Sequence, residues 1–340
     1  MLKTAATAGA DMTDDSADVL VLPDDVHGID AADYAAELRE RLPDRRVAYA
    51  RDRDRVLSLA ADAPVMTGLH ADDELVETAD RLRLFACVFA GVDHLPVDRM
   101  ADRGVAVTSA SGVQAPNAAE HAVGGLLSLV RGFDVARRRK RNREWRTYPT
   151  DELAGSTVAV VGMGSIGTAV CERLGPFDVE RVGVRHSPEK DGPVERTLGY
   201  DDAGRAFAEA DHVVLACPLT ELTRGLVDDA ALRALPPHAV VVNVARGPVV
   251  DTAALVDALR GGGVAGAALD VTDPEPLPAD HPLWGFENVL VTPHNAGHTP
   301  KYFERTADLL AENVDRLAST TDGALREADP DAADLHNGLR

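Results

Sequence analysis

Short apolar runs alternate with helical patterns in the first third of the chain. Tyr34, Leu38 and Leu42 recur at a spacing of four residues, which is typical of one face of a helix, and residues 72–78 indicate another helix. Because strands alternate with helices, the pattern favours a parallel sheet that is covered on both faces. The expected strands are residues 19–22, 47–50, 64–67, 84–89 and 105–108.

A second alternating block begins at Ser156. Its helices are expected at residues 165–174 and 301–317, and the polar residues after Ala318 predict a frayed tail. Two such blocks in 340 residues predict two α/β domains. The expected strands of this block are residues 158–161, 182–184, 212–217, 240–244, 267–270 and 289–292.

A long helix is expected between the two blocks. It begins near Pro116, where Asn117 and Glu120 have the spacing of an N-terminal capping pair, and it is predicted to run on through residues 136–145, which are rich in arginine. This basic run is either a solvated helix face or an arm that packs on an acidic partner subunit. A nucleic-acid contact is a more distant alternative.

The charge balance of the whole chain is strongly acidic. Fifty-six Asp and Glu residues against 35 Lys and Arg residues give a net charge of −21, which argues against nucleic acid as the main partner. An acidic, lysine-poor and alanine-rich composition is typical of halophilic proteins, because at about 1 M salt the Debye length falls to about 3 Å. The alternative is a genome rich in G and C, which favours the same residues.

The three cysteines and the chain start carry little chemistry of their own. Cys87, Cys171 and Cys217 have no paired spacing, so neither a disulfide framework nor a metal site is expected. The chain has no apolar run of 18 residues and no signal pattern, so a cytoplasmic protein is expected. Residues 1–11 suggest a disordered leader, with Met12 as an alternative start.

A glycine-rich loop follows the expected strand 158–161 and opens a helix. In a GxGxxG of this context the first glycine makes a tight turn, the second lets the backbone approach a pyrophosphate, and the third lets helix and strand pack closely. The amides at the helix start then hold the anion. The alternative is a tight turn that binds nothing. The loop consists of Gly162, Met163, Gly164, Ser165, Ile166 and Gly167.

The residues after the next strand bear on the choice of cofactor. NAD-binding folds carry an acidic residue about 20 positions beyond the loop, where it binds the ribose 2′-hydroxyl. Here Arg185, His186 and Ser187 follow the strand instead. A guanidinium suits a 2′-phosphate, so the sequence predicts NADP as the preferred cofactor and leaves acceptance of NAD open. The alternative is a solvent-exposed loop arginine.

Three ionisable residues stand just after later strands: Arg246, Glu275 and His294. Because ligands of open α/β sheets bind at the carboxyl ends of the strands, we expect the three side chains to converge. With the glycine-rich loop, their segments resemble the D-isomer-specific 2-hydroxyacid dehydrogenase family over nearly the whole chain. The segments are residues 162–167, 243–251, 270–278 and 292–297.

The resemblance implies a catalytic set of Arg246, Glu275 and His294. Arg246 would hold the carboxylate and keto oxygen of a 2-keto acid, and protonated His294 would donate to that oxygen while Glu275 orients the ring. Reduction to a D-2-hydroxy acid with NADPH follows as the expected reaction. The sequence departs from the family at Thr272, where an aromatic residue is usual, and at Arg185.

The resemblance also implies further site residues. The amides of Gly91 and Val92 would bind the substrate carboxylate, and Met66 would line the side-chain pocket. His94, His121 and His298 are expected to be structural or surface residues. The remaining cofactor contacts would come from Cys217, Pro218, Leu219, Val244, Ala245, Asp270 and Gly297.

The domain order implied by the resemblance is discontinuous. Residues 12–112 and 299–330 would form a flavodoxin-like substrate domain, and residues 113–298 a Rossmann dinucleotide-binding domain inserted in it. A homodimer through the segment from Asn117 to Trp145 is expected. The alternative function is an NAD(P)-sensing regulatory protein on the same fold, which would bind NADPH but turn over keto acids feebly.

Overall fold

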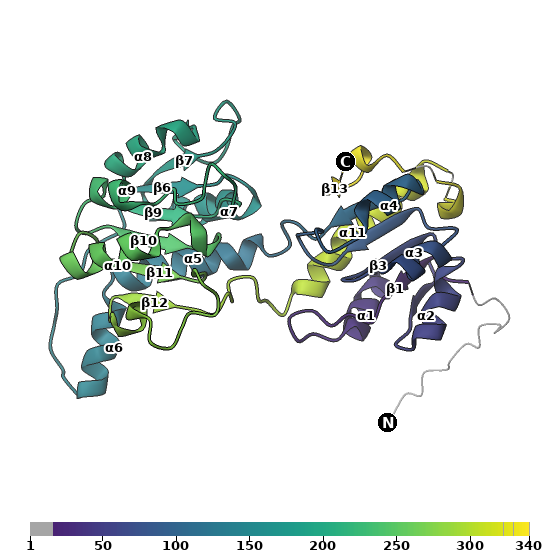
Figure 1. The fold of residues 1–340 in the computed structure, drawn as a ribbon, viewed down its shortest axis with the longest axis horizontal. Coiled ribbons are helices and arrows are strands. Elements are labelled where there is room, and N and C mark those ends of the chain that lie inside the picture. Colours follow the sequence, from purple (N-terminus) through teal and green to yellow (C-terminus); the bar gives the residue numbers. More distant parts are fainter. Residues whose placement is uncertain (1–15, 322, 329, 340) are drawn as a thin grey trace, which may run out of the picture. The chain divides into compact units, whose positions relative to one another are not determined.

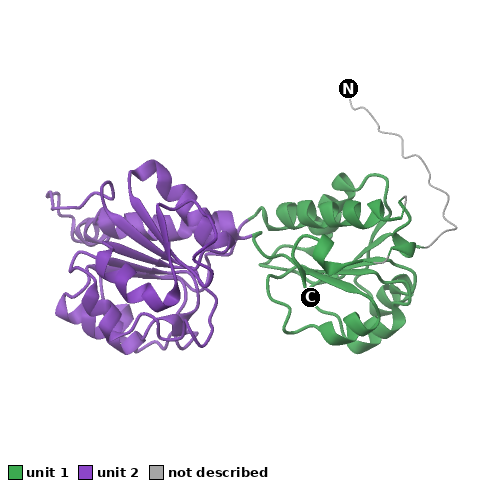
Figure 2. Cartoon of the chain, turned by 90° about the horizontal axis from the view of Figure 1, so that it is seen from above, with its two compact units in different colours: residues 1–113, 300–340 green, residues 114–299 purple. Residues whose placement is uncertain are grey.

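The computed structural model describes residues 16–321, 323–328 and 330–339. The chain divides into two compact units, one of residues 1–113 and 300–340 and the other of residues 114–299 (Figures 1 and 2). The expected leader and the alternative start at Met12 lie outside the described residues. Among the described helices, none is both long and apolar enough to cross a bilayer.

Unit 1 is built on a sheet of the order β13-β5-β4-β3-β1-β2, whose first five strands in the chain are parallel. The order 2-1-3-4-5 is that of flavodoxin-like folds. Its helices are α1 (Ala31–Arg41), α2 (Arg53–Ala60), α3 (Asp73–Thr78), α4 (Val97–Asp102) and α11 (Tyr302–Ser319). Its parallel strands are β1 (Val19–Val21), β2 (Val47–Tyr49), β3 (Val65–Gly68), β4 (Leu84–Cys87) and β5 (Ala106–Ser109).

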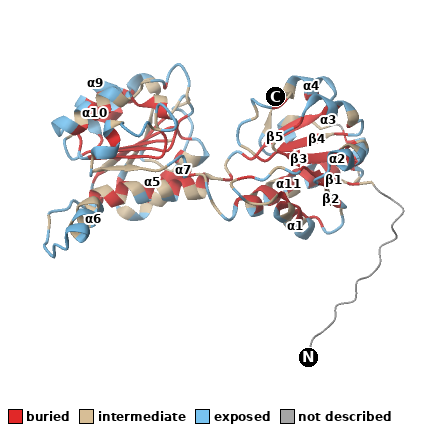
Figure 3. Ribbon diagram, turned by 60° about the horizontal axis from the view of Figure 1, so that its bottom comes forward, coloured by how far each residue is buried: buried red, intermediate tan, exposed pale blue. Residues whose placement is uncertain are grey.

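Each strand of unit 1 sends alternate side chains to opposite faces, as its twofold period requires. Val19 and Val21 pack in the cluster that contains α1 and α11 residues, whereas Leu20 packs in the cluster that contains residues of α2, α3 and α4. Both faces of the sheet are therefore covered, and the strands β1, β3, β4 and β5 are buried (Figure 3).

The C-terminal segment corrects the expectation of a frayed tail after Ala318 and of a domain end at residue 330. The chain continues through η5 (Leu325–Glu327) and η6 (Ala332–Asp334) into β13 (Gly338–Leu339), which pairs antiparallel with β5. Leu325 and Leu335 are buried against the unit 1 core, and the Asn337 side chain donates to the Ser109 and Ser111 carbonyls. Spaced apolar residues and an unpaired sheet edge thus hold a segment whose composition is mostly polar.

Unit 2 contains a parallel sheet of the order β12-β11-β10-β9-β6-β7-β8. Counted within the unit this is 3-2-1-4-5-6 with a seventh strand, the Rossmann order. Its strands are β6 (Thr157–Val161), β7 (Glu180–Val184), β8 (Arg196–Leu198), β9 (His212–Leu215), β10 (Val240–Asn243), β11 (Gly266–Leu269) and β12 (Val289–Val291). The predicted fold class, two doubly wound parallel-sheet domains, is confirmed.

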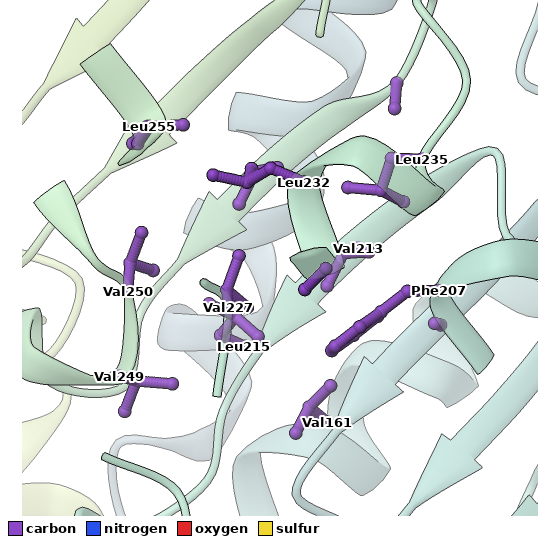
Figure 4. Close-up of a cluster of buried hydrophobic side chains, with 14 of the residues drawn as sticks. Val161, Phe207, Val213, Leu215, Val227, Leu232, Leu235, Val249, Val250 and Leu255 are labelled. Atoms are coloured by element: carbon purple, nitrogen blue, oxygen red, sulfur yellow. The ribbon is translucent and has the colours of Figure 1, made fainter. Parts of the chain in front are cut away.

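Helices cover both faces of the unit 2 sheet. On one face Phe207, Leu232 and Leu255 pack against Val213 and Leu215 of β9 and their neighbours (Figure 4). On the other face, residues of α5 and α7 pack against alternate residues of the same strands. The helices are α5 (Ala115–Val130), α6 (Phe133–Asn142), α7 (Ser165–Leu174), α8 (Ala203–Glu209), α9 (Asp229–Ala234) and α10 (Thr252–Gly261), with short turns η1 (Gly175–Phe177), η2 (Tyr200–Asp202), η3 (Gly247–Val249) and η4 (Pro282–Gly285).

The expected long helix is in fact two helices. Gly132 has a φ of +64°, so α5 ends at Val130 and α6 starts anew at Phe133. The N-cap of α5 is Gln114, and Asn117 lies inside the helix with its side chain bound elsewhere. The predicted capping pair is therefore wrong, because the N-cap of the helix lies three residues before Asn117.

Candidate active site

The glycine-rich loop lies between β6 and α7, where the strand order of unit 2 reverses. Gly162 has a φ of +92°, and a Cβ there would lie 2.5 Å from the backbone N and Cα of Cys217. A Cβ on Gly167 would lie 1.8 Å from the Gly162 carbonyl oxygen. These two positions therefore exclude side chains for the reasons that the motif predicts.

The space next to Gly164 is open. A Cβ at this position would meet no atom within 4 Å, and Gly164 caps α7 without any side-chain hydrogen bond. The first amides of α7 are thus left for another acceptor, and the positive end of the helix favours an anion there. The loop fits the pyrophosphate of a dinucleotide. The Met163 side chain is buried against Gly183 and Cys171, where it supports the loop from behind.

Arg185 stands directly after β7, next to the loop. Its amide donates to the Leu198 carbonyl at 3.0 Å, which holds the backbone beside β8. The guanidinium has only long contacts, to the carbonyls of Lys190 and Asp191 at 3.5 and 3.4 Å. The end of β7 therefore carries a partly exposed cation, followed by exposed His186 and half-buried Ser187.

Cys217 lies two residues after the end of β9, and its backbone packs against the turn at Gly162. Burial raises the pKa of the Cys217 thiol to about 11. The thiol is therefore protonated at neutral pH and acts as a small apolar side chain. The Pro218 carbonyl accepts from the buried Thr223 hydroxyl at 2.6 Å, which holds the turn that contains Leu219.

Arg246 follows β10 and is held by the wholly buried Asn243. Asn243 accepts from the Ala245 amide at 3.0 Å and donates to the Arg246 carbonyl at 3.1 Å. The Arg246 guanidinium is exposed and gives one N–H to the Ala245 carbonyl at 2.7 Å. Its remaining donors are available to a ligand. Asn243 holds the turn of Arg246 and was not singled out by the sequence pattern, although a polar amide at the end of an apolar strand is a visible signal.

The loop of Arg246 lies directly against the loop that carries Glu275. A Cβ on Gly247 would lie 2.0 Å from the Thr272 carbonyl oxygen, so only glycine permits this approach. Thr272 in turn donates its amide to Oε1 of Glu275 at 2.9 Å. The structure therefore brings together two segments that the sequence separates by 28 residues.

Glu275 and His294 form a pair. Oε2 of Glu275 lies 3.1 Å from Nδ1 of His294, and the two side chains are 39% and 51% exposed. His294 has a φ of +52°, an unusual conformation for a residue with a side chain, and its amide donates to the Asp270 carbonyl at 2.8 Å. Because Nδ1 is bound to the carboxylate, Nε2 is the ring nitrogen left for a substrate.

The carboxylate of Asp270 organises the loop around His294. It is buried and accepts from the Thr292 hydroxyl at 2.6 Å, the Asn295 amide at 2.7 Å and the Ala296 amide at 2.9 Å. Its expected contact with a nicotinamide carboxamide stays a prediction. Gly297 ends this loop against Gln114, whose Oε1 would lie 2.9 Å from an added Cβ.

A pocket of about 480 Å³ adjoins the pair. Trp284 is one of its walls; it is half exposed, and its indole N–H donates to the Pro278 carbonyl at 2.9 Å. Only the rarity of tryptophan in the chain could have drawn attention to it. The lining residues are Asp270, Thr272, Glu275, Pro276, Leu277, Trp284, Val291, Thr292, Pro293 and His294.

The predicted substrate contacts outside this set belong to unit 1. Gly91 and Val92 lie on the loop after β4, where Gly91 is exposed and has open space at its Cβ position. Met66 is a correction, because its side chain is wholly buried among Leu20 and Phe85 and cannot line a pocket. The alternation along β3 directs it to the α2–α4 face. Within the described residues, no group of three or more His, Cys, Asp or Glu could hold a metal.

Comparisons with known proteins agree on one family. The family model "D-isomer specific 2-hydroxyacid dehydrogenase, NAD binding domain" matches residues 123–296. The chain is 36% identical over 273 residues to the glyoxylate reductase of Thermofilum pendens, which covers 78% of each chain. It is 34% identical over 251 residues to the human glyoxylate reductase/hydroxypyruvate reductase, covering 72% of this chain and 76% of the relative.

A solved structure has the same architecture. The D-isomer specific 2-hydroxyacid dehydrogenase from Xanthobacter autotrophicus Py2, in complex with NADPH and MES, is 28% identical to this chain. The TM-score is 0.74, and the match covers 95% of this chain and 98% of that one.

Proposed function

Because the chain belongs to the D-isomer-specific 2-hydroxyacid dehydrogenase family, oxidoreductases that use a nicotinamide cofactor, we propose that it reduces 2-keto acids to D-2-hydroxy acids with NADPH. The observation that carries this proposal is the Glu275–His294 pair at 3.1 Å, in the same unit as a loop that fits a pyrophosphate. The glyoxylate and hydroxypyruvate reductases among its relatives support small 2-keto acids as substrates.

His294 acts as the acid in this proposal. When bound, NADPH supplies the hydride that adds to the keto carbon. The proton on Nε2 of His294 passes to the keto oxygen, which becomes the hydroxyl. The Glu275 carboxylate at Nδ1 stabilises the imidazolium before the transfer and fixes the ring. In the reverse reaction Nε2 takes the proton back.

Arg246 binds the substrate in this proposal. One N–H of its guanidinium is used by the Ala245 carbonyl, and this contact orients the group. The other donors match a carboxylate and an adjacent keto oxygen, which a planar fork can hold together. That the amides of Gly91 and Val92 add to this binding remains a prediction.

Turnover is the first test. The purified protein, in high salt, is assayed for NADPH and NADH oxidation with 2-keto acids from glyoxylate to branched six-carbon acids. We expect turnover with at least one group of acids and a higher kcat/KM for NADPH than for NADH. Tight NADPH binding without turnover of any acid would contradict the proposal and favour a nucleotide-sensing protein.

Arg185 supports the choice of NADPH, because its partly exposed guanidinium stands where a 2′-phosphate would be recognised. We expect Arg185→Asp to lower kcat/KM for NADPH by about 10- to 100-fold, since a hydrogen bond to a charged group contributes roughly 1.5–3 kcal/mol. Lys190→Asp makes the same change of charge further along the loop and serves as the control. Equal effects of the two variants would refute a specific role of Arg185.

We also propose a homodimer through the segment from Asn117 to Trp145. The α6 helix has no buried residue, and Phe133 and Trp145 are exposed beside a basic surface on an otherwise acidic chain. Trp145→Ser is expected to shift the protein toward monomer in light scattering at high salt. Leu222→Ser removes a comparable exposed apolar side chain elsewhere and should not. A monomeric wild type would overturn the proposal.

A further inference from the structure

Two side chains of α5 reach the two ends of the segment that carries His294. The Asn117 side chain donates to the Ala296 carbonyl at 2.6 Å. One helical turn further on, Nε2 of His121 lies 3.0 Å from the Thr292 hydroxyl oxygen. Since His294 stands midway between Thr292 and Ala296, α5 holds the catalytic segment on both sides of it.

The direction of the His121 contact follows from the protons available. The Thr292 hydroxyl has one hydrogen, and it is donated to Oδ1 of Asp270 at 2.6 Å. The hydroxyl oxygen can then only accept from His121, so Nε2 of His121 carries a hydrogen. The three groups form a chain in which His121 donates to Thr292 and Thr292 donates to Asp270. Nε2 also lies 3.6 Å from Oδ1 of the Asp270 carboxylate.

The chain of hydrogen bonds from His121 reaches the segment of His294 through Asp270. Its side chain accepts the amides of Asn295 and Ala296, and its own carbonyl accepts the amide of His294. A donor chain ending on a buried carboxylate is strengthened by polarisation along its length. His121 therefore stabilises the acceptor on which the backbone of the His294 segment depends.

The Glu275–His294 pair cannot position itself. Both side chains are more than a third exposed, and an exposed pair of opposite charges contributes little to stability. The left-handed conformation of His294 is strained for a residue with a side chain, so the surrounding structure must impose it. We therefore infer that the hydrogen bonds of Asp270 to the amides of residues 294–296, rather than the Glu275–His294 pair, hold this conformation.

We propose that His121 is a positioning residue for the acid His294, acting through Thr292 and Asp270. The inference rests on the proposed function in one respect, that His294 is the proton donor. It assigns His121 a part in the reaction, where the sequence alone indicated a structural or surface residue.

The test compares variants that remove or keep the donor. His121→Phe keeps a ring and loses the N–H, whereas His121→Gln keeps an N–H at a similar reach. We expect His121→Phe to lower kcat by about 10- to 100-fold, as a small misplacement of a catalytic group does, with the Kd of NADPH within about twofold of wild type. His121→Gln should restore kcat to within about threefold. His238→Phe, at an exposed histidine elsewhere in unit 2, is the control.

Thr292 provides a second arm. Thr292→Val should reproduce the kcat loss of His121→Phe and Thr292→Ser should not, and the double variant should lose little more than either single variant because the two act in one chain. A role in folding alone predicts instead that kcat per folded molecule stays at the wild-type value, or that Gln and Phe at position 121 behave alike. Either result would overturn the inference.

A readout without turnover separates this inference from the proposed function. Hydrogen exchange of the peptide that covers residues 292–296 reports the amides held by Asp270. We expect faster exchange there in His121→Phe than in His121→Gln, whether or not the wild type reduces any keto acid. Unchanged exchange in His121→Phe would show that His121 does not hold the segment.

Discussion

At the scale of single residues, the candidate site depends on His294. Its side chain is half exposed, and its amide donates to the Asp270 carbonyl. We expect His294→Ala to lower kcat by about 100- to 10,000-fold, the range of general acid catalysis, with NADPH binding unchanged. Glu275→Gln should give a smaller loss, because an amide still bonds to Nδ1 but does not stabilise the imidazolium. Steady-state kinetics on purified, folded variants measures both. A mild effect of His294→Ala would remove it as the acid.

A second histidine makes a prediction about pH. His212 is buried at the start of β9, and its Nδ1 accepts the Val240 amide at 3.2 Å. Burial, which disfavours the charged form, lowers the pKa of His212 to about 4. The unfolded chain, with an ordinary value near 6.5, takes up the proton first as the pH falls. Stability from this group is therefore complete above about pH 6.5 and is lost between there and about pH 4.

The size of this effect can be measured by denaturant unfolding. Between pH 7 and pH 5 the wild type should lose about 2 kcal/mol of unfolding free energy through His212. The glutamine of His212→Gln does not titrate in this range, so this variant should lose about 2 kcal/mol less unfolding free energy than the wild type. Parallel losses in the two proteins would show that the histidine is protonated in the folded state.

At the scale of elements, two glycines in the turn from β6 into α7 should affect different properties. Gly167 should affect the stability of the fold, and Gly164 should affect the binding of NADPH. Gly167→Ala would place a Cβ 1.8 Å from the Gly162 carbonyl oxygen, and it should destabilise the protein by about 1–3 kcal/mol or more. Gly164→Ala meets open space at an ordinary φ of −79°, and its thermal unfolding should match the wild type. Its added methyl should nonetheless weaken NADPH binding at least tenfold, measured by fluorescence titration. Normal NADPH binding by Gly164→Ala would contradict the assignment of the loop.

Some elements of the fold have local sequence signals and others do not. The sequence pattern located all five parallel strands of unit 1, since short apolar runs between turn residues are local signals. It predicted one helix where α5 and α6 are separate, because the break depends on a positive φ at Gly132 that the neighbouring residues do not predict. It missed β13, whose two residues form a strand only because β5 offers a free edge.

At the scale of the whole molecule, the net charge of −21 predicts a dependence on salt. Arg–acid pairs are present on the surface, but 21 acids remain in excess, and their mutual repulsion is screened as the Debye length falls from about 10 Å at 0.1 M to about 3 Å at 1 M. The unfolding free energy should therefore rise steeply between 0.1 and 2 M KCl. A fold indifferent to this change would contradict a halophilic protein.

The sequence by itself determined the fold class and the family, and it supplied the proposed catalytic set. The glycine-rich loop, Arg246, Glu275 and His294 could be proposed from the sequence because each stands in a short segment whose pattern is local. The close approach of the Arg246 and Glu275 loops through Gly247 agrees with their expected convergence.

Only the tertiary structure decided which of the other candidates are buried and which form hydrogen bonds around the site. Met66 lies in β3, and a strand pattern does not predict which face of the strand is covered by helices. In the structure the Met66 side chain is buried. Asn117 stands in a sequence pattern typical of a helix N-cap. In the structure its side chain instead donates to the carbonyl of Ala296, 179 residues away. His121 and Thr292 meet across 171 residues. Burial and long-range hydrogen bonds are properties of the packed chain, and no local pattern encodes them.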